Sequence, residues 1–274
     1  MCNTCMVLFL LIRHFEITTF IYRYFEFSYT FSYENKFMIK YLIELMGEKK
    51  NIDMKKKNIF RVAFYLLGLV ILALGLILNT KSQLGVSPIL SVANAFAEIL
   101  NSSLSTMTLY QYILFVIVEM VLHALYVKKD LKKILVMDIF QIVISVLFTR
   151  FMKLFMGYIP VATTITSKII FLVFGILCTG IGAAMSLDMR MIPNPGDGIV
   201  QTIADCIHKR VGITKNVFDT ANVLLTCIVS FIFLHKIVGI GIGTIACMLG
   251  VGRVIAIFND IFKNKLSNIC GIKE

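Results

Sequence analysis

Six long apolar stretches occupy most of the chain between residues 60 and 258. An α-helix rises ~1.5 Å per residue, so roughly 20 residues cross the ~30 Å hydrocarbon core of a bilayer. Barrel strands alternate apolar and polar residues, which these stretches do not, so helices are the structure that satisfies the backbone in lipid. We predict an all-α polytopic membrane helix bundle with six transmembrane helices, Phe60–Asn79, Met107–Val127, Ile134–Met156, Ser167–Leu187, Val217–Leu234 and Ile237–Phe258.

The charges between these stretches predict how the chain crosses the membrane. The net charge is +11, although only 16% of the residues are charged and 58% are hydrophobic. Of the lysines and arginines from Lys55 onward, sixteen fall on the side of the membrane that precedes the first span and five on the opposite side. By the positive-inside rule both termini are cytoplasmic. We therefore expect a multi-pass protein of a bacterial cytoplasmic membrane, whose basic residues meet anionic lipid rather than nucleic acid.

This count requires that two shorter segments, Val86–Leu100 and Asn194–His208, do not cross the membrane. The apolar part of the first is too short to span, and the second carries several ionisable residues, so we predict two non-spanning helices, re-entrant or interfacial. The membrane domain is predicted over residues 54–266, with halves at about 58–157 and 167–262, followed by a short cytoplasmic tail, 267–274.

Residues 1–53 are richer in charged and aromatic residues than the spans and contain no convincing signal peptide. Met54 precedes three lysines and the first span, as in a common bacterial membrane-protein start. Two interpretations stand: the extension results from a misassigned start site, or it forms an amphipathic interfacial segment.

The two halves resemble each other at a spacing of 107 residues. This spacing aligns Gly68 with Gly175, Gly75 with Gly182, and Pro88 with Pro195, and a small gap aligns Arg150 with Arg253. Three crossings in each half would orient the second half opposite to the first. We therefore predict a 3+3 inverted repeat, an arrangement on which many secondary transporters are built.

The most distinctive local motif is a helix-breaking segment: Pro193, Asn194, Pro195, Gly196, Asp197 and Gly198. Its prolines and glycines prevent a regular helix, and Asp197 is placed where it would cap the next short helix. One interpretation is an ordinary capped loop. The other is a broken helix whose free N–H groups bind an anion, or whose carboxylate binds a cation. The counterpart in the first half has no acid, so the halves are chemically unequal.

Ionisable residues inside spans are costly and usually face a cavity or a partner. Glu119 and His123 are four residues apart and share a helix face, which fits either a proton relay or a structural hydrogen-bonded pair. Asp138 and Gln141 share a face of the third span. Asp138 is near the basic end of that span, so we favour a snorkelling or salt-bridged acid.

In the second half, Asp219 and Asn222 share a face of the fifth span. Arg253 lies inside the sixth span and requires an acidic partner, for which we predict Asp219 or Asp197. Together with Glu119 and His123, these residues are the predicted substrate or ion pathway.

Gly239, Gly241, Gly243 and Thr244 form a bare segment that we assign to close helix packing in lipid. The segment follows no strand, so it does not fit a phosphate-binding loop. The sequence shows no hydrolase or metalloprotease motif, and its seven cysteines are irregularly spaced. We therefore predict that the protein is not an enzyme and has no cofactor, zinc site or disulfide framework.

Several of these motifs resemble those of the YczE/YyaS/YitT group of bacterial integral membrane proteins. Asn194–Val200 resembles its Gly-Pro-Arg-Asp-Gly-Leu-Met segment, and Val238–Ile245 resembles its Gly-x-Gly-x-Gly-Thr segment. Leu84–Pro88 resembles its first-half Gly-x-x-Pro-Trp-Asp element, and Asp219 stands where the group often has Glu. The group has no settled biochemical activity, so the resemblance, over about residues 58–262, implies architecture more than function.

Two departures from that pattern weaken the transfer of a charged pair: Ile89-Leu90 replace Trp-Asp, and Gly196 replaces Arg. The leading functional prediction is a secondary transporter or permease for an unidentified small solute. The alternative is a non-transporting membrane subunit that assists or regulates another protein, as a homo-oligomer or with a membrane-protein partner. A transporter requires a cavity lined by the acids, whereas such a subunit would bury the acids in pairs.

Overall fold

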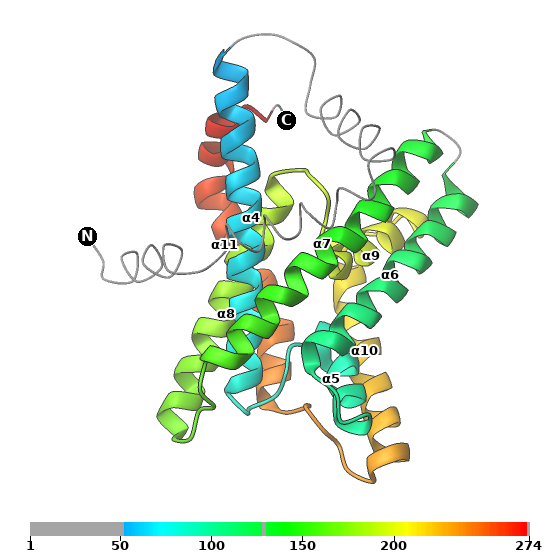
Figure 1. Ribbon diagram of the computed structural model, residues 1–274, viewed down its shortest axis with the longest axis vertical. Helices are drawn as coiled ribbons and strands as arrows, with labels where there is room; N and C mark the ends of the chain where they lie inside the picture. Colours follow the sequence, from blue (N-terminus) through cyan, green and yellow to red (C-terminus); the bar gives the residue numbers. More distant parts are fainter. Residues whose placement is uncertain (1–51, 128–129, 273–274) are drawn as a thin grey trace, which may run out of the picture. The chain divides into compact units, whose positions relative to one another are not determined.

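The computed structural model describes residues 52–127 and 130–272 (Figure 1). Within these ranges the chain forms eight helices and no strand: α4 (Ile52–Lys81), α5 (Pro88–Ile99), α6 (Leu104–Tyr126), α7 (Leu131–Tyr158), α8 (Ile165–Asp188), α9 (Pro195–Cys206), α10 (Val211–Leu234) and α11 (Ile242–Cys270). The predicted extension, residues 1–53, lies outside the described residues apart from the first residues of α4.

Six of these helices, α4, α6, α7, α8, α10 and α11, are long and apolar enough to cross a membrane. The predicted all-α class with six membrane-length helices is confirmed. The largest difference in bounds is at α11, which begins at Ile242 rather than Ile237 and continues to Cys270, into the predicted tail. Gly239 has a φ of +75°, which is not helical, so α11 cannot extend back through this residue to Ile237.

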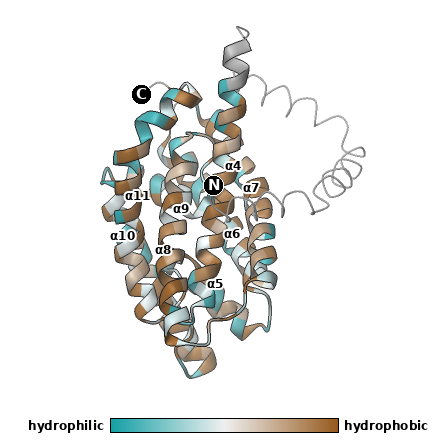
Figure 2. Ribbon diagram, turned by 90° about the vertical axis from the view of Figure 1, so that its left-hand side faces the viewer, coloured by the Kyte–Doolittle hydropathy of each residue, from teal (hydrophilic) through white to brown (hydrophobic). Residues whose placement is uncertain are grey.

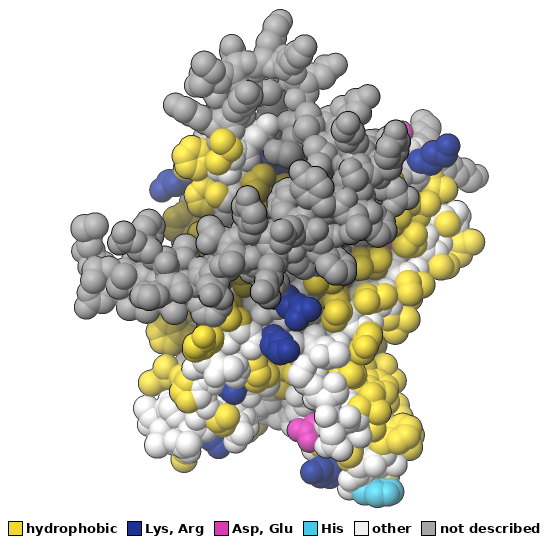
Figure 3. All heavy atoms as spheres, viewed as in Figure 1, with side chains coloured by type: hydrophobic (Ala, Val, Ile, Leu, Met, Phe, Trp, Pro, Cys, Tyr) yellow, Lys and Arg dark blue, Asp and Glu magenta, His cyan; other side chains and the backbone are white. Residues whose placement is uncertain are grey.

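Large apolar side chains cover the outward faces of the long helices. Phe231, Ile232 and Phe233 are consecutive in α10 and are 65%, 60% and 62% exposed. Figure 2 shows apolar residues along most of each long helix, and hydrophobic side chains make up much of the described surface in Figure 3. A soluble monomer rarely exposes apolar surface of this extent, so these faces are suited to lipid tails.

The two short helices, α5 and α9, have the same construction. Each has 12 residues and starts with proline, after an extended cap residue, Ser87 or Asn194, whose side chain makes no capping bond. Twelve residues extend only ~18 Å, so neither helix crosses a bilayer. Their first and last residues are separated by the same 107 positions that align the halves in the sequence.

The helices form two groups that exchange partners between the halves. The short helices pack across the halves, α5 against α10 and α9 against α6. Helix α8 packs against both α4 and α11, and these three helices lie beside the group formed by α5, α6, α9 and α10 (Figure 1). Helix α7 packs against α6. One difference between the halves is in the packing of their last two helices. Helix α6 packs extensively against α7, whereas the counterparts α10 and α11 make few contacts.

Glycines bring the backbones of α4 and α8 into close contact. A Cβ atom on Gly75 would lie 2.8 Å from the carbonyl oxygen of Gly175, and one on Gly68 would lie 3.0 Å from that of Gly182. Residue numbers rise along α4 as they fall along α8, so the helices are antiparallel. Gly75 thus faces Gly175, the sequence counterpart of Gly68, and Gly68 faces Gly182, the sequence counterpart of Gly75. A two-fold relation between two helices produces such reciprocal pairs. The inverted repeat of the whole halves stays a prediction.

The pairing of Arg150 with Arg253 in that repeat is not supported by the helix bounds. Arg150 follows the start of α7, Leu131, by 19 residues, and Arg253 follows the start of α11, Ile242, by 11 residues. The two positions differ by about two helical turns. A gap chosen to align the two arginines therefore misplaces the third helices of the halves.

The glycine-rich segment predicted to pack between helices instead pairs with a loop. Gly239 and Gly241 precede α11, and only Gly243 and Thr244 lie in its first turn. Val86 N donates to Gly239 O at 2.8 Å, and Gly243 N donates to Leu84 O at 2.7 Å. The segment therefore fixes the loop that leads into α5, and the bare backbone permits the close approach.

Candidate functional site

A cavity of about 40 Å³ lies between the two helix groups. Helices α4, α8 and α11 contribute Leu72, Leu76, Thr179, Ala183, Cys247, Val251 and Ile255. The other group contributes Ser87, Pro88, Ile89, Tyr112, Asn194, Gly196, Asp197, Lys215 and Asp219. One wall is thus almost wholly apolar, and the opposite wall carries all of the charges.

The lining residues come mostly in pairs that are related by the spacing of the halves. Five such pairs line the cavity: Leu72 and Thr179, Leu76 and Ala183, Ser87 and Asn194, Ile89 and Gly196, and Tyr112 and Asp219. Equivalent backbone positions of the two halves therefore converge on one cavity. The side chains in each pair differ, so the cavity is chemically asymmetric.

The amino-terminal ends of α5 and α9 both reach this cavity, since it is lined by Ser87–Ile89 and by Asn194, Gly196 and Asp197. First-turn N–H groups lack intrahelical partners and carry partial positive charge. The motif separates α8, which ends at Asp188, from α9, which begins at Pro195, and Asp197 is not the cap of α9. Asn194 holds that position, and its carbonyl oxygen accepts from Asp197 N and Gly198 N at 2.8 Å.

Three charged side chains from α9 and α10 face one another here. Lys215 Nζ lies 3.8 Å from Asp197 Oδ1, and these side chains are 25% and 17% exposed. Asp219 lies one turn after Lys215 in α10 and is buried. Sequence reasoning counted Lys215 only as a topology charge. The overlooked signal was the spacing of four residues between Lys215 and Asp219, which places both side chains on one face of the helix.

Two polar residues of the predicted set have other surroundings. Arg253 is exposed, and its Nη1 donates to Leu249 O, one turn earlier in α11. The predicted pairing of Arg253 with Asp219 or Asp197 is wrong, because a side chain on the outer face of α11 cannot reach the cavity; Lys215 is the cation beside these acids. Asn222 is buried and donates to Phe218 O within its own helix.

A glutamine that the sequence did not single out holds α5 in place. Gln111 Nε2 donates to Ile89 O at 2.8 Å, and Gln111 Oε1 accepts from Ala93 N at 3.0 Å. This carbonyl and this N–H are the partners that an α-helix joins directly. The Gln111 amide thus ties α6 to the first turn of α5, next to the cavity.

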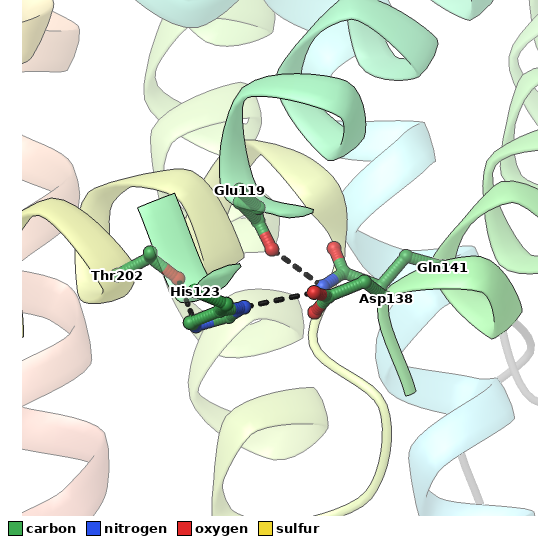
Figure 4. Close-up of polar contacts among 5 residues, drawn as sticks. All are labelled: Glu119, His123, Asp138, Gln141 and Thr202. Carbon is green, nitrogen blue, oxygen red and sulfur yellow. Dashed lines mark hydrogen bonds and ion pairs between the residues drawn. The ribbon is translucent and has the colours of Figure 1, made fainter. Parts of the chain in front are cut away.

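A second polar cluster lies among α6, α7 and α9 (Figure 4). Gln141 Nε2 donates to Glu119 Oε2 at 2.6 Å, and His123 Nδ1 lies 2.8 Å from Asp138 Oδ2. His123 Nε2 also lies 3.2 Å from Thr202 Oγ1. The structure therefore pairs Glu119 and His123 each with α7. None of these five residues is among those that line the cavity.

Helix α9 separates the cluster from the cavity. A Cβ atom on Gly198 would lie 2.8 Å from Glu119 Oε1 and 2.9 Å from Gln141 Oε1, so the bare backbone of α9 rests on these side chains. Asp197, the preceding residue, faces the cavity instead. The two sides of the first turn of α9 thus contact two different polar groups.

The fold and the cavity define an integral, multi-pass helical membrane protein with a charged internal cavity. Among the residues that the structure describes, no group of three or more His, Cys, Asp or Glu residues is arranged to hold a metal ion. The chain belongs to a family of unknown function, DUF6198, whose profile matches residues 59–260. No curated protein and no solved structure matches the chain.

Proposed function

We propose that the protein is a secondary transporter or permease for a small solute, and that the central cavity is its binding site. The observation that carries this proposal is the meeting of three charged side chains, Asp197, Lys215 and Asp219, in a cavity enclosed by membrane-length helices. Charges among membrane-spanning helices are expensive, and they commonly mark solute or ion pathways.

The position of the cavity supports the same function. It lies between two helix groups and at the amino-terminal ends of two short broken helices, as binding sites do in many secondary transporters. Alternating access needs two groups that move relative to each other around a fixed site.

The predicted pathway residues take different roles in this proposal. Asp197 and Asp219 contact the solute or its coupling ion, and Lys215 joins them. Glu119 is buried and His123 is half-buried, and each is paired with α7, so they position α9 from the side away from the cavity. The acids of this cluster are paired, as expected of a non-transporting subunit. Asp219 in the cavity is different, because its buried Oδ1 accepts no hydrogen bond within the described residues.

The proposal includes the location and orientation expected from the charges. The membrane is a bacterial cytoplasmic membrane, and both termini are cytoplasmic. The resemblance to the YczE/YyaS/YitT group fits this assignment, since that group consists of bacterial membrane proteins.

The test is charge movement and solute flux in proteoliposomes that contain the full chain. Small amino acids, amines and carboxylates are applied in turn, with the parent protein beside Asp219→Asn and Asp205→Asn. Asp205 is exposed, lies in α9 and does not line the cavity, so its variant is the matched control. We expect flux from the parent and the control and a loss of at least about tenfold from Asp219→Asn. Equal flux from the two variants would contradict the proposal.

A further inference from the structure

The cavity contains two buried oxygen atoms that accept no hydrogen bond within the described part of the chain. They are Oδ1 of Asp219, which is 5% exposed, and Oδ1 of Asn194, which is 3% exposed. Both residues line the cavity. Leaving a buried acceptor without a donor is costly, and more so for a carboxylate. The cavity is therefore suited to a ligand that brings positive charge.

The side-chain charges of the cavity do not cancel. Asp197 and Asp219 are two carboxylates, and Lys215 is one ammonium group. The ammonium is not tightly held, because its 3.8 Å distance to Asp197 Oδ1 exceeds the about 2.7–2.9 Å of a charge-assisted hydrogen bond. The amino-terminal ends of α5 and α9 add only partial positive charge, which falls off within the first turn of each helix. One unit of negative charge is the amount that these side chains leave unmatched.

The size and the lining groups narrow the class of ligand. A volume of about 40 Å³ accommodates an ion with one or two waters, because each water needs roughly 10–15 Å³ by this measure. Most of the other polar side chains around the cavity carry oxygens, namely the hydroxyls of Ser87, Tyr112 and Thr179. Oxygen ligands suit hard cations rather than soft ones. The single negative charge that the side chains leave unmatched favours a monovalent ion over a divalent one.

We propose that the central cavity binds one small monovalent metal cation through Asp219, Asn194 and Asp197, while Lys215 stays beside these acids and balances one of the two carboxylates. The role of the ion rests on the proposed function: in a transporter it is the coupling ion. Binding itself does not depend on transport and can be measured without it.

The experiment is equilibrium binding of radiolabelled sodium to the purified full chain, in choline chloride at constant ionic strength. We expect saturable binding by the parent protein, weakened at least about tenfold in Asp219→Asn and unchanged in Asp205→Asn. Lys215→Gln removes a neighbouring positive charge that repels the cation, so it should bind sodium about tenfold more tightly. A gain of affinity cannot arise from misfolding, and thermal unfolding without sodium verifies that Asp219→Asn is folded.

The absence of saturable sodium binding from both the parent and Lys215→Gln would overturn the proposal, as would equal affinities of Asp219→Asn and Asp205→Asn. The outcome of the transport assay is independent of the outcome of the binding assay. Sodium binding with this pattern, but without flux of any solute, would leave the cation site standing and remove the transporter. Solute flux without sodium binding would do the reverse.

Discussion

The close crossing of α4 and α8 predicts a large effect for a very small substitution. In Gly75→Ala the new Cβ atom would lie 2.3 Å from Thr179 N and 2.6 Å from Thr179 Oγ1. In Gly182→Ala, at the corresponding position of the other half, it would lie 2.3 Å from Leu72 N. The nearest obstacle is backbone in both variants, so no side-chain rotation relieves the contact and the helices must separate by about 1 Å to reach ordinary packing distances.

Two opposing terms set the size of the effect. Overpacking of a well-packed contact costs about 1–3 kcal/mol, and a rigid backbone obstacle places these variants at the upper end. Replacing glycine by alanine inside a helix returns ~1 kcal/mol of helix propensity. The net loss is about 2 kcal/mol, which lowers the midpoint of thermal unfolding by roughly 4–8 °C for a chain of this size.

The assay is thermal unfolding in detergent, followed with a dye that reacts with newly exposed thiols. The chain suits it, because free Cys247 and Cys270 are buried in the folded state. Gly252→Ala in α11 is the matched control, since nothing lies within 4 Å of its added Cβ atom. We expect the control to be unchanged or slightly stabilised. If Gly75→Ala and Gly252→Ala unfolded at the same temperature, the backbone contact of α4 with α8 would be refuted.

Three further predictions test other parts of the molecule. His123→Leu leaves Asp138 buried without its partner, so it should destabilise the protein by about 3–5 kcal/mol, and the added change Asp138→Leu should recover part of that loss in the same unfolding assay. Gly198→Ala meets only the ends of side chains that can move, so its cost should be roughly 1 kcal/mol, below that of Gly75→Ala. Single cysteines in Asn101→Cys and Lys209→Cys should react with impermeant thiol reagents from opposite faces of the membrane; labelling from the same face would refute the predicted topology.

The sequence was sufficient for the helices because the bilayer imposes a strong length rule. Runs of about 20 apolar residues must be helical in lipid, and prolines at positions 88 and 195 mark where the short helices begin. The error at α11 has a physical cause. Hydropathy does not distinguish an apolar helix from an apolar loop, and the residues around Gly239 are apolar although their backbone is not helical.

The site was less predictable, because partner assignment depends on the rotation of each helix about its axis. Glu119 and His123 were correctly placed on one face, yet their partners come from α7. Arg253 was assigned an acid because it lies within a span, but its face of α11 is exposed. Gln111 had no visible signal at all, since an uncharged amide in a span acquires its role only from the α5 backbone that it meets.

The unequal halves have a mechanical consequence that follows from where the charges lie. Every charged residue of the cavity belongs to α9 or α10, and the corresponding positions in the first half are Leu90, Thr108 and Tyr112. Because the backbone at Gly198 rests on the side chains of Glu119 and Gln141, we expect a rearrangement of that cluster to shift the first turn of α9. Asp197 is the preceding residue, so the same movement alters its distance to Lys215. The buried cluster can therefore bias the cavity without containing any residue that touches it.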